Sequence, residues 1–131
     1  MRPDLFHVAH ADVPFVDVIN TMSDPSIPLT VGEYEEWGNP SEPEAHRRIR
    51  DYSPLDNLVA RPYPTLFLQG SWHDSRVPYW EPAKLYARLS LANAETATLS
   101  NRTTLLKTDM TSGHGGASGR FKAWREGARQ D

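Results

Sequence analysis

The segment from Tyr63 to Gly70 constrains the fold of this chain more than any other. Its central residues are almost continuously apolar, Pro64 stands near its start, and Gly70 ends it. A short apolar run bounded by proline and glycine is typical of a strand that is buried on both faces, as the central strands of parallel sheets are. We therefore expect a parallel sheet that is covered by helices.

Two more strands are predicted, one before this segment and one after it. Residues 6–16 contain several β-branched and aromatic side chains and predict a strand that ends near Pro14. Leu105–Met110 predict another strand, which is followed by a glycine-rich loop over residues 111–119.

Helices are predicted between and after these strands. Ser41 is expected to cap a helix that has Pro43 in its first turn and ends at Ser53. A second helix is expected after residue 79, and a third over residues 120–130. The apolar face predicted for the second helix consists of Trp80, Ala83, Ala87 and Leu91, and its polar stripe consists of Glu81, Lys84 and Arg88.

The resulting order of elements is strand, helix, strand, helix, strand, helix, which is typical of an α/β fold. Residues 17–37 contain Pro25, Pro28 and Gly32 and are expected to be a mostly irregular excursion. Parallel sheets of this class usually have about four to six strands. We therefore expect the chain to be an incomplete part of a larger α/β domain, in which residues 2–6 resemble the end of a preceding helix. The alternative is an unusually small complete domain.

The composition excludes several classes of protein. The chain has no cysteine, which excludes a disulfide scaffold, a thiol nucleophile and a cysteine-ligated zinc site. Its net charge of −3 argues against a nucleic-acid surface. It contains neither an apolar run of the roughly 20 residues that cross a bilayer nor a signal-peptide pattern. We expect a cytoplasmic protein that binds neither nucleic acid nor membrane.

Two of the predicted loops carry residues suited to proton transfer. Asp74 follows the strand that contains Leu68, and His114 lies in the glycine-rich loop after Met110. Loops at the carboxyl ends of neighbouring parallel strands lie close together. A carboxylate beside an imidazole is the orienting half of a hydrolase triad, and serine, then aspartate, then histidine is the chain order of the α/β-hydrolase fold.

Other interpretations of these residues stay open at this point. Asp74 could be an ordinary turn former, and His114 an ordinary loop histidine. The doublet His73-Asp74 also occurs in metal-dependent phosphohydrolases, but no other histidine stands at a spacing that would complete a metal site. We therefore expect no metal and no cofactor.

An acidic segment, residues 31–37, is the third candidate feature. Its carboxylates, Glu33, Glu35 and Glu36, stand among aromatic residues and could form a pocket for a cationic side chain. The alternative is a solvated acidic loop. The chain has no Gly-x-Ser-x-Gly elbow, so it contains no nucleophile for the predicted pair.

Five blocks of this sequence resemble the oligopeptidase B branch of the prolyl oligopeptidase family, which is the trypsin-like branch of those serine peptidases. The resemblance runs from Arg2 to about Lys122. The blocks are 13–22, 32–40, 52–57, 79–84 and 112–116, in the same order as in the family.

The resemblance implies an α/β-hydrolase domain that in the family is joined to a β-propeller, which restricts access to short peptides. It implies that Asp74 and His114 are the triad aspartate and histidine. It implies that Glu33 and Glu35 bind the arginine or lysine side chain at the cleavage site, and that Arg76 holds the substrate backbone.

In the family, the nucleophilic serine lies shortly before the segment that matches residues 2–6, and the oxyanion-hole tyrosine and the propeller lie further upstream. We therefore expect residues 1–131 to be the C-terminal part of a peptidase catalytic domain, acting on short peptides after Arg or Lys and inactive alone. Its expected partners are the peptide substrate and the missing N-terminal part of the peptidase. The alternative is a non-catalytic half-domain that is completed by a separately encoded piece.

Overall fold

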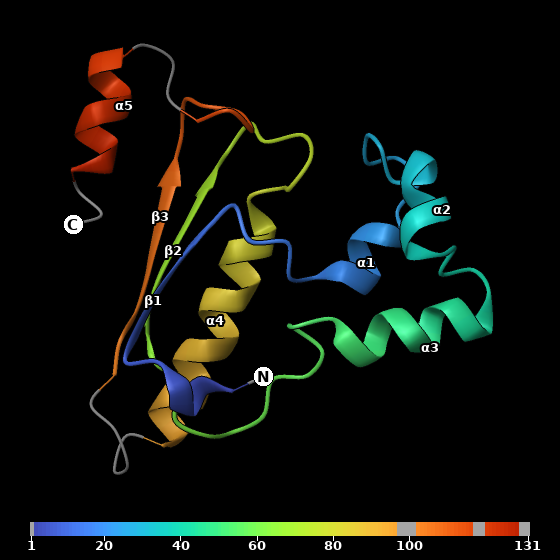
Figure 1. The fold of residues 1–131 in the computed structure, drawn as a ribbon, viewed down its shortest axis with the longest axis horizontal. Helices are drawn as coiled ribbons and strands as arrows, with labels where there is room; N and C mark the ends of the chain where they lie inside the picture. Colours follow the sequence, from blue (N-terminus) through green and yellow to red (C-terminus); the bar gives the residue numbers. More distant parts are fainter. Residues whose placement is uncertain (1, 97–101, 117–119, 129–131) are drawn as a thin grey trace.

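A computed structural model describes residues 2–96, 102–116 and 120–128. In this part of the chain, three parallel strands form one sheet in the order β1 (Val8–Asp12), β2 (Thr65–Ser71) and β3 (Thr104–Asp109) (Figure 1). Leu68 pairs in register with Ala11 on one side and with Leu106 on the other. The parallel sheet and the α/β class predicted from the sequence are thus confirmed.

Helix α4 (Trp80–Glu95) runs along one face of this sheet and forms the main hydrophobic core with it (Figure 1). Leu68 is fully buried at the centre of that core. Its other buried members are Val16, Tyr63, Leu85, Leu89 and Ala92. We call β1, β2, β3 and α4 the sheet lobe.

A second group of helices lies to one side of the sheet lobe (Figure 1). It consists of α1 (Val18–Met22), the short 3-10 helix η2 (Val31–Glu33), α2 (Tyr34–Trp37) and α3 (Pro43–Tyr52). These elements enclose a separate hydrophobic core of Val18, Ile19, Met22 and Ile49. We call residues 18–52 the pocket lobe.

The structure corrects three details of the expected fold. Residues 17–37 were expected to be mostly irregular, but they contain three short helical segments, α1, η2 and α2. Residues of α1 and α2 pack in the same core as Ile49, so tertiary contacts support these segments. Ser41 does not cap α3, because the N-cap position is Glu42, with no side-chain hydrogen bond.

The third correction concerns α4, whose predicted face is wrong. Leu91 is 63% exposed and Trp80 37%, whereas Leu85, Leu89 and Ala92 are buried. Glu81, which was placed on the polar stripe, is completely buried. The helical spacing of apolar residues predicts the wrong face because Glu81, a charged residue, is buried, where it accepts hydrogen bonds.

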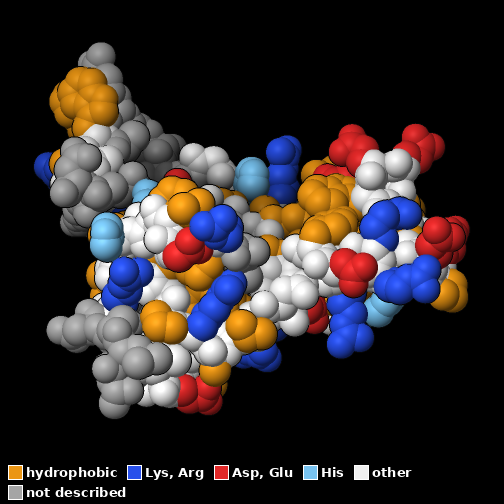
Figure 2. Space-filling view, turned by 60° about the horizontal axis from the view of Figure 1, so that its bottom comes forward, with side chains coloured by type: hydrophobic (Ala, Val, Ile, Leu, Met, Phe, Trp, Pro, Cys, Tyr) orange, Lys and Arg blue, Asp and Glu red, His pale blue; other side chains and the backbone are white. Residues whose placement is uncertain are grey.

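Short helices lie near the two ends of the chain. The 3-10 helix η1 (Pro3–Leu5) precedes β1, and α5 (Arg120–Gly127) follows β3. Residues 117–119 of the predicted glycine-rich loop and residues 129–130 of the predicted last helix lie outside the described residues. On the face that Figure 2 presents, acidic and basic side chains are interspersed. Among the described helices, none has the length and apolar character required to span a membrane.

Candidate active site

Asp74 is held in a tight loop that begins where β2 ends. Its side chain is fully buried. One carboxylate oxygen, Oδ1, accepts hydrogen bonds from the backbone N–H groups of Arg76, at 2.8 Å, and Val77, at 2.9 Å. The loop is therefore folded around this carboxylate, and the side chain has little freedom to turn away from its site.

His114 is held by the loop that follows β3. The carboxylate of Asp109 accepts hydrogen bonds from the backbone N–H groups of Thr111 and Ser112 and so shapes the start of that loop. Gly113 and Gly116 form an isolated antiparallel bridge around His114. A Cβ atom on Gly113 would lie 3.3 Å from the carbonyl oxygen of His73, so glycine allows the two loops to approach closely.

The two loops bring His114 and Asp74 into direct contact. Nδ1 of His114 lies 2.9 Å from Oδ2 of Asp74 and 3.0 Å from Oδ1. An ionised carboxylate only accepts hydrogen bonds, so the ring donates its Nδ1–H to Asp74. In the neutral ring, the other nitrogen, Nε2, then carries no proton and can accept one. The His114 side chain is 40% exposed.

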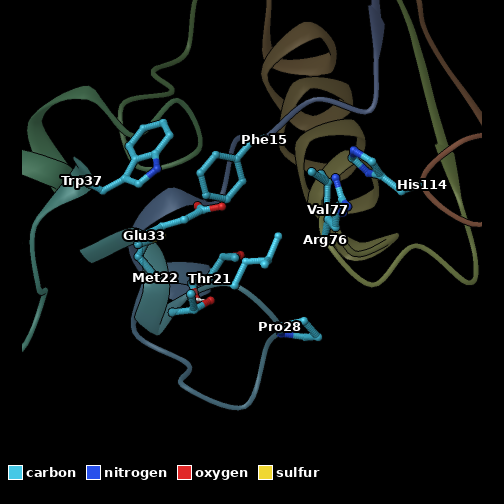
Figure 3. Close-up of a pocket in the computed structure, with 11 residues that line it drawn as sticks. Phe15, Thr21, Met22, Pro28, Glu33, Trp37, Arg76, Val77 and His114 are labelled. Carbon is cyan, nitrogen blue, oxygen red and sulfur yellow. Dashed lines mark hydrogen bonds between the residues drawn. The ribbon is translucent and has the colours of Figure 1, made fainter. Parts of the chain in front are cut away.

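A pocket of about 240 Å³ lies between the two lobes, and His114 is part of its wall (Figure 3). Glu33, Arg76 and His114 are its ionisable groups. Its apolar wall includes Phe15 and Trp37, whose rings meet edge to face with centroids 5.5 Å apart. The remaining lining residues are Thr21, Met22, Pro28, Leu29, Thr30 and Val77. A carboxylate beside aromatic rings suits a cationic group.

The structure does not bring all of the predicted site residues together. Glu33, Arg76 and His114 share the pocket, and Asp74 contacts His114. Glu35 is exposed and lines a different hollow with Glu42, Glu44 and Arg48. Glu36 is exposed as well.

Sequence reasoning missed most of the side chains that line the pocket, and Phe15 and Leu29 are two examples. Phe15 and Leu29 come from connecting segments whose place depends on tertiary packing, so no spacing in the sequence indicates them. Leu29 has a positive φ of 77°, which is uncommon for a residue with a side chain and turns the chain sharply at the pocket wall.

Thr21 connects the pocket to the completely buried Glu81, because its hydroxyl donates a hydrogen bond to Glu81 Oε1. Burial raises the pKa of Glu81 above its usual value, and the hydrogen bonds that it accepts from Thr21, Asp17 and Val16 partly offset this effect. Nothing in the spacing of α4 distinguishes Glu81 from a surface glutamate.

The described residues include no group of three or more histidine, cysteine, aspartate or glutamate side chains placed to hold a metal ion. The alternative based on His73 and Asp74 therefore gains no further ligand from this part of the structure.

Comparison with known proteins identifies the family of this chain. The sequence model of the prolyl oligopeptidase family matches residues 1–130. The chain belongs to this family. Over 128 residues it is 48% identical to dipeptidyl aminopeptidase BI from Pseudoxanthomonas mexicana. The aligned region covers 98% of this chain and 17% of that protein.

Solved structures of family members agree with the fold. Oligopeptidase B from Leishmania major is 51% identical, with a TM-score of 0.88, over 98% of this chain and 17% of that one. Oligopeptidase B from Trypanosoma brucei, solved in a closed form with covalently bound antipain, is 54% identical with a TM-score of 0.88, over 99% of this chain and 18% of that one. The chain thus spans less than a fifth of the length of these relatives.

Proposed function

We propose that this chain supplies the proton-transferring pair and the side-chain pocket of a serine peptidase that cleaves short peptides after arginine or lysine. The observation that carries this proposal is the contact between His114 Nδ1 and the buried carboxylate of Asp74, at one end of a pocket that contains Glu33. Membership of a peptidase family supports it.

In the proposed reaction, a serine hydroxyl attacks the carbonyl carbon of the basic residue and forms an acyl-enzyme, which water then hydrolyses. Nε2 of His114 takes the hydroxyl proton and later returns it to the leaving amine. Asp74 keeps the proton on Nδ1 and stabilises the imidazolium that forms. The covalent antipain adduct of the Trypanosoma brucei relative is consistent with covalent chemistry in the family.

The proposed substrate pocket holds a guanidinium or ammonium group against Glu33, beside the rings of Phe15 and Trp37. Glu35 lies outside this pocket, and in the proposal it adds negative potential at longer range. Arg76, which lines the pocket beside His114, is placed to hold the peptide backbone.

The nucleophile has to come from outside these residues, because the chain has no Gly-x-Ser-x-Gly elbow. We propose that residues 1–131 are the C-terminal part of a catalytic domain, whose elbow and propeller are supplied by the rest of the peptidase. The coverage of 17% of the relatives' length supports this proposal. The same coverage also fits a half-domain that is completed by a separately encoded piece. Sequencing the reading frames next to this gene distinguishes the two arrangements.

The isolated chain is therefore expected to lack serine-peptidase activity, since removing the nucleophile removes the covalent step. The test incubates the purified chain with an arginine reporter peptide and with a fluorophosphonate probe. Neither cleavage nor labelling is expected. Specific labelling of a serine together with cleavage of the reporter would overturn the proposal.

A further inference from the structure

The two hydrophobic cores of this protein are separated by a polar junction. Val16 belongs to the core of the sheet lobe, and Val18 belongs to the core of the pocket lobe. Asp17 stands between them and is completely buried. The two cores share no buried residue, and polar contacts link the chain segments that meet here.

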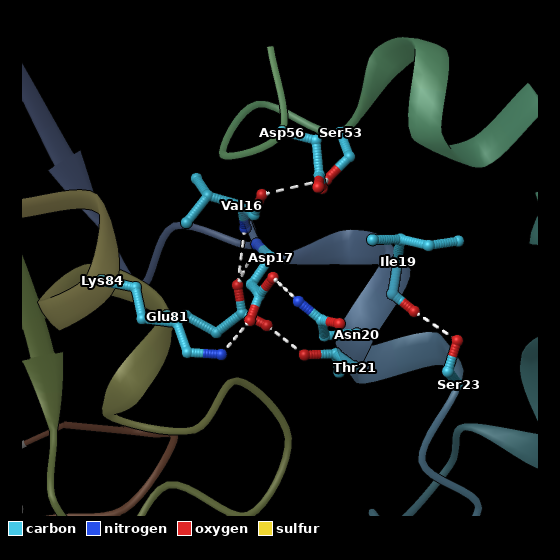
Figure 4. A network of polar contacts seen from close by, with 10 residues as sticks. All are labelled: Val16, Asp17, Ile19, Asn20, Thr21, Ser23, Ser53, Asp56, Glu81 and Lys84. Atoms are coloured by element: carbon cyan, nitrogen blue, oxygen red, sulfur yellow. Dashed lines mark hydrogen bonds and ion pairs between the residues drawn. The ribbon is translucent and has the colours of Figure 1, made fainter. Parts of the chain in front are cut away.

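Glu81 accepts three hydrogen bonds at this junction, and the one from Thr21 reaches the pocket lobe itself (Figure 4). Its Oε2 accepts hydrogen bonds from the backbone N–H groups of Val16, at 2.8 Å, and Asp17, at 2.5 Å, and its Oε1 accepts one from the hydroxyl of Thr21. These partners lie 60 to 65 positions away in the sequence. The first turn of α4 is thereby tied to the first turn of α1.

Asp17 strengthens the same junction from the opposite side. Its carboxylate pairs with Lys84, one turn after Glu81 on α4, and accepts a hydrogen bond of 2.6 Å from Asn20. Hydrogen bonds are directional, and a buried network in which every member is paired fixes an orientation more narrowly than apolar contact does. The junction therefore defines an angle between the lobes as well as holding them together.

The base of Glu81 is itself fixed to the sheet. A Cβ atom on Gly70 would lie only 2.8 Å from Pro82 Cγ, so the start of α4 packs closely against the end of β2. The loop that carries Asp74 and Arg76 lies between these two elements in the sequence. Glu81 thus moves with the sheet lobe and with the Asp74–His114 pair.

The pocket combines residues from both sides of this junction. Thr21 and Glu33 come from the pocket lobe, whereas Arg76 and His114 come from the loops of the sheet lobe (Figure 3). A rotation of one lobe against the other would change the distance between Glu33 and His114. Thr21 belongs to the pocket wall and to the junction alike, so the two are directly connected.

We propose that Glu81 is a positioning residue: it sets the orientation of the pocket lobe relative to the Asp74–His114 pair, and thereby aligns the cation pocket with His114. This inference rests on the function proposed above.

The first test measures orientation in the full 131-residue chain, using residual dipolar couplings of backbone amides. In the wild type, one alignment tensor is expected to fit both lobes. In Glu81→Ala the tensors of the two lobes should separate, while each lobe still fits its own tensor. Glu81→Gln, whose amide oxygen still accepts from Val16 and Asp17, should restore one tensor. Glu95→Ala, an exposed position on the same helix, is the matched control.

The second test measures affinity for Nα-acetylarginine amide by titration of the same samples. Glu81→Ala is expected to weaken binding about tenfold, the effect of losing the alignment of one charge-assisted contact. Glu81→Gln and Glu95→Ala should bind within about twofold of the wild type. If Glu81→Ala does not fold, Glu81→Asp replaces it, because the shorter side chain keeps the charge but cannot reach its three partners together.

The outcomes separate this inference from the proposed function. A single tensor and unchanged affinity in the folded Glu81 variant would overturn the role of Glu81. If the tensors separate but the wild-type chain binds no acetylarginine amide, the proposed function fails and the orienting role of Glu81 stands.

Discussion

Glu33 and Glu35 are two positions apart in the sequence but have different surroundings. Glu33 is half-buried in the pocket that also contains His114, whereas Glu35 is exposed in a separate hollow with Arg48. A carboxylate that is partly shielded from water attracts a cation more strongly than an exposed one does. The two residues should therefore contribute unequally to binding of a basic side chain.

Glu33→Gln is expected to weaken the binding of Nα-acetylarginine amide about tenfold or more, because it removes a charge-assisted hydrogen bond. Glu35→Gln, the matched control, should change the affinity by less than about threefold. Titration of the isolated chain, followed by NMR, measures both. Equal losses in the two variants would show that the pocket is not the cation site.

Glu81 is expected to make stability depend on pH. Burial raises its pKa above the ordinary glutamate value of 4.5, so the folded chain binds this proton more tightly than the unfolded chain does. The contribution of Glu81 to the free energy of unfolding is then fully present below pH 4.5 and is lost as the pH rises through the folded-state pKa.

Glu81→Gln removes this titration. Relative to the wild type, the variant should therefore become progressively more stable as the pH rises from about 4 to about 7. Urea denaturation at several pH values measures the difference. A wild-type advantage that grows with pH would contradict the raised pKa.

At the scale of elements, the strand β2 and the contact between its loop and the loop after β3 could be predicted. A continuous apolar run predicts a buried parallel strand, and successive parallel strands place their following loops side by side. That reasoning predicts that Asp74 lies near His114, and the two side chains are in contact in the structure. The end of α3 was predictable too, because Ser53 precedes a proline.

The pocket lobe could not be predicted in the same way. Helices α1 and α2 have five and four residues, too few to show a helical period or to be stable without tertiary packing. The face of α4 was wrongly predicted because a glutamate is normally taken to face solvent. Whether Glu81 is buried depends on the N–H groups of Val16 and Asp17, which are distant in sequence.

The packing of α4 on β2 depends on Gly70. A Cβ atom there would lie 2.8 Å from Pro82 Cγ, so Gly70→Ala is expected to lower the free energy of unfolding by about 1–3 kcal/mol. Gly32→Ala is the matched control, because nothing lies within 4 Å of the added atom, and its effect should stay within about 0.5 kcal/mol. Urea denaturation measures both. Equal stability of the two variants would show that Pro82 can move aside for the added Cβ atom, which would contradict the prediction.

At the scale of the whole molecule, the described part of the sheet has two outer strands, and each of them is paired on one side only. Large apolar side chains are exposed on these strands and beside them, namely Leu5, Phe6, Val8, Leu105 and Met110. Exposed apolar groups along strand edges are typical of a surface that packs against other protein. This arrangement supports the proposal that the chain is part of a larger catalytic domain.

The central claim is that Asp74 and His114 are the orienting acid and the base of a peptidase triad. A chimera tests it most directly: residues 1–131 replace the matching segment of oligopeptidase B from Trypanosoma brucei, which is 54% identical. The rest of that enzyme then supplies whatever these residues lack.

The measurement is kcat of the chimera on an arginine reporter peptide. His114→Ala is expected to lower kcat by about a thousandfold or more, and Asp74→Asn by a similar factor, because each removes proton transfer by a correctly oriented imidazole. His73→Ala, an exposed neighbour of Asp74, should leave kcat within about threefold of the unmodified chimera. An active chimera whose kcat is unaffected by His114→Ala would contradict the account.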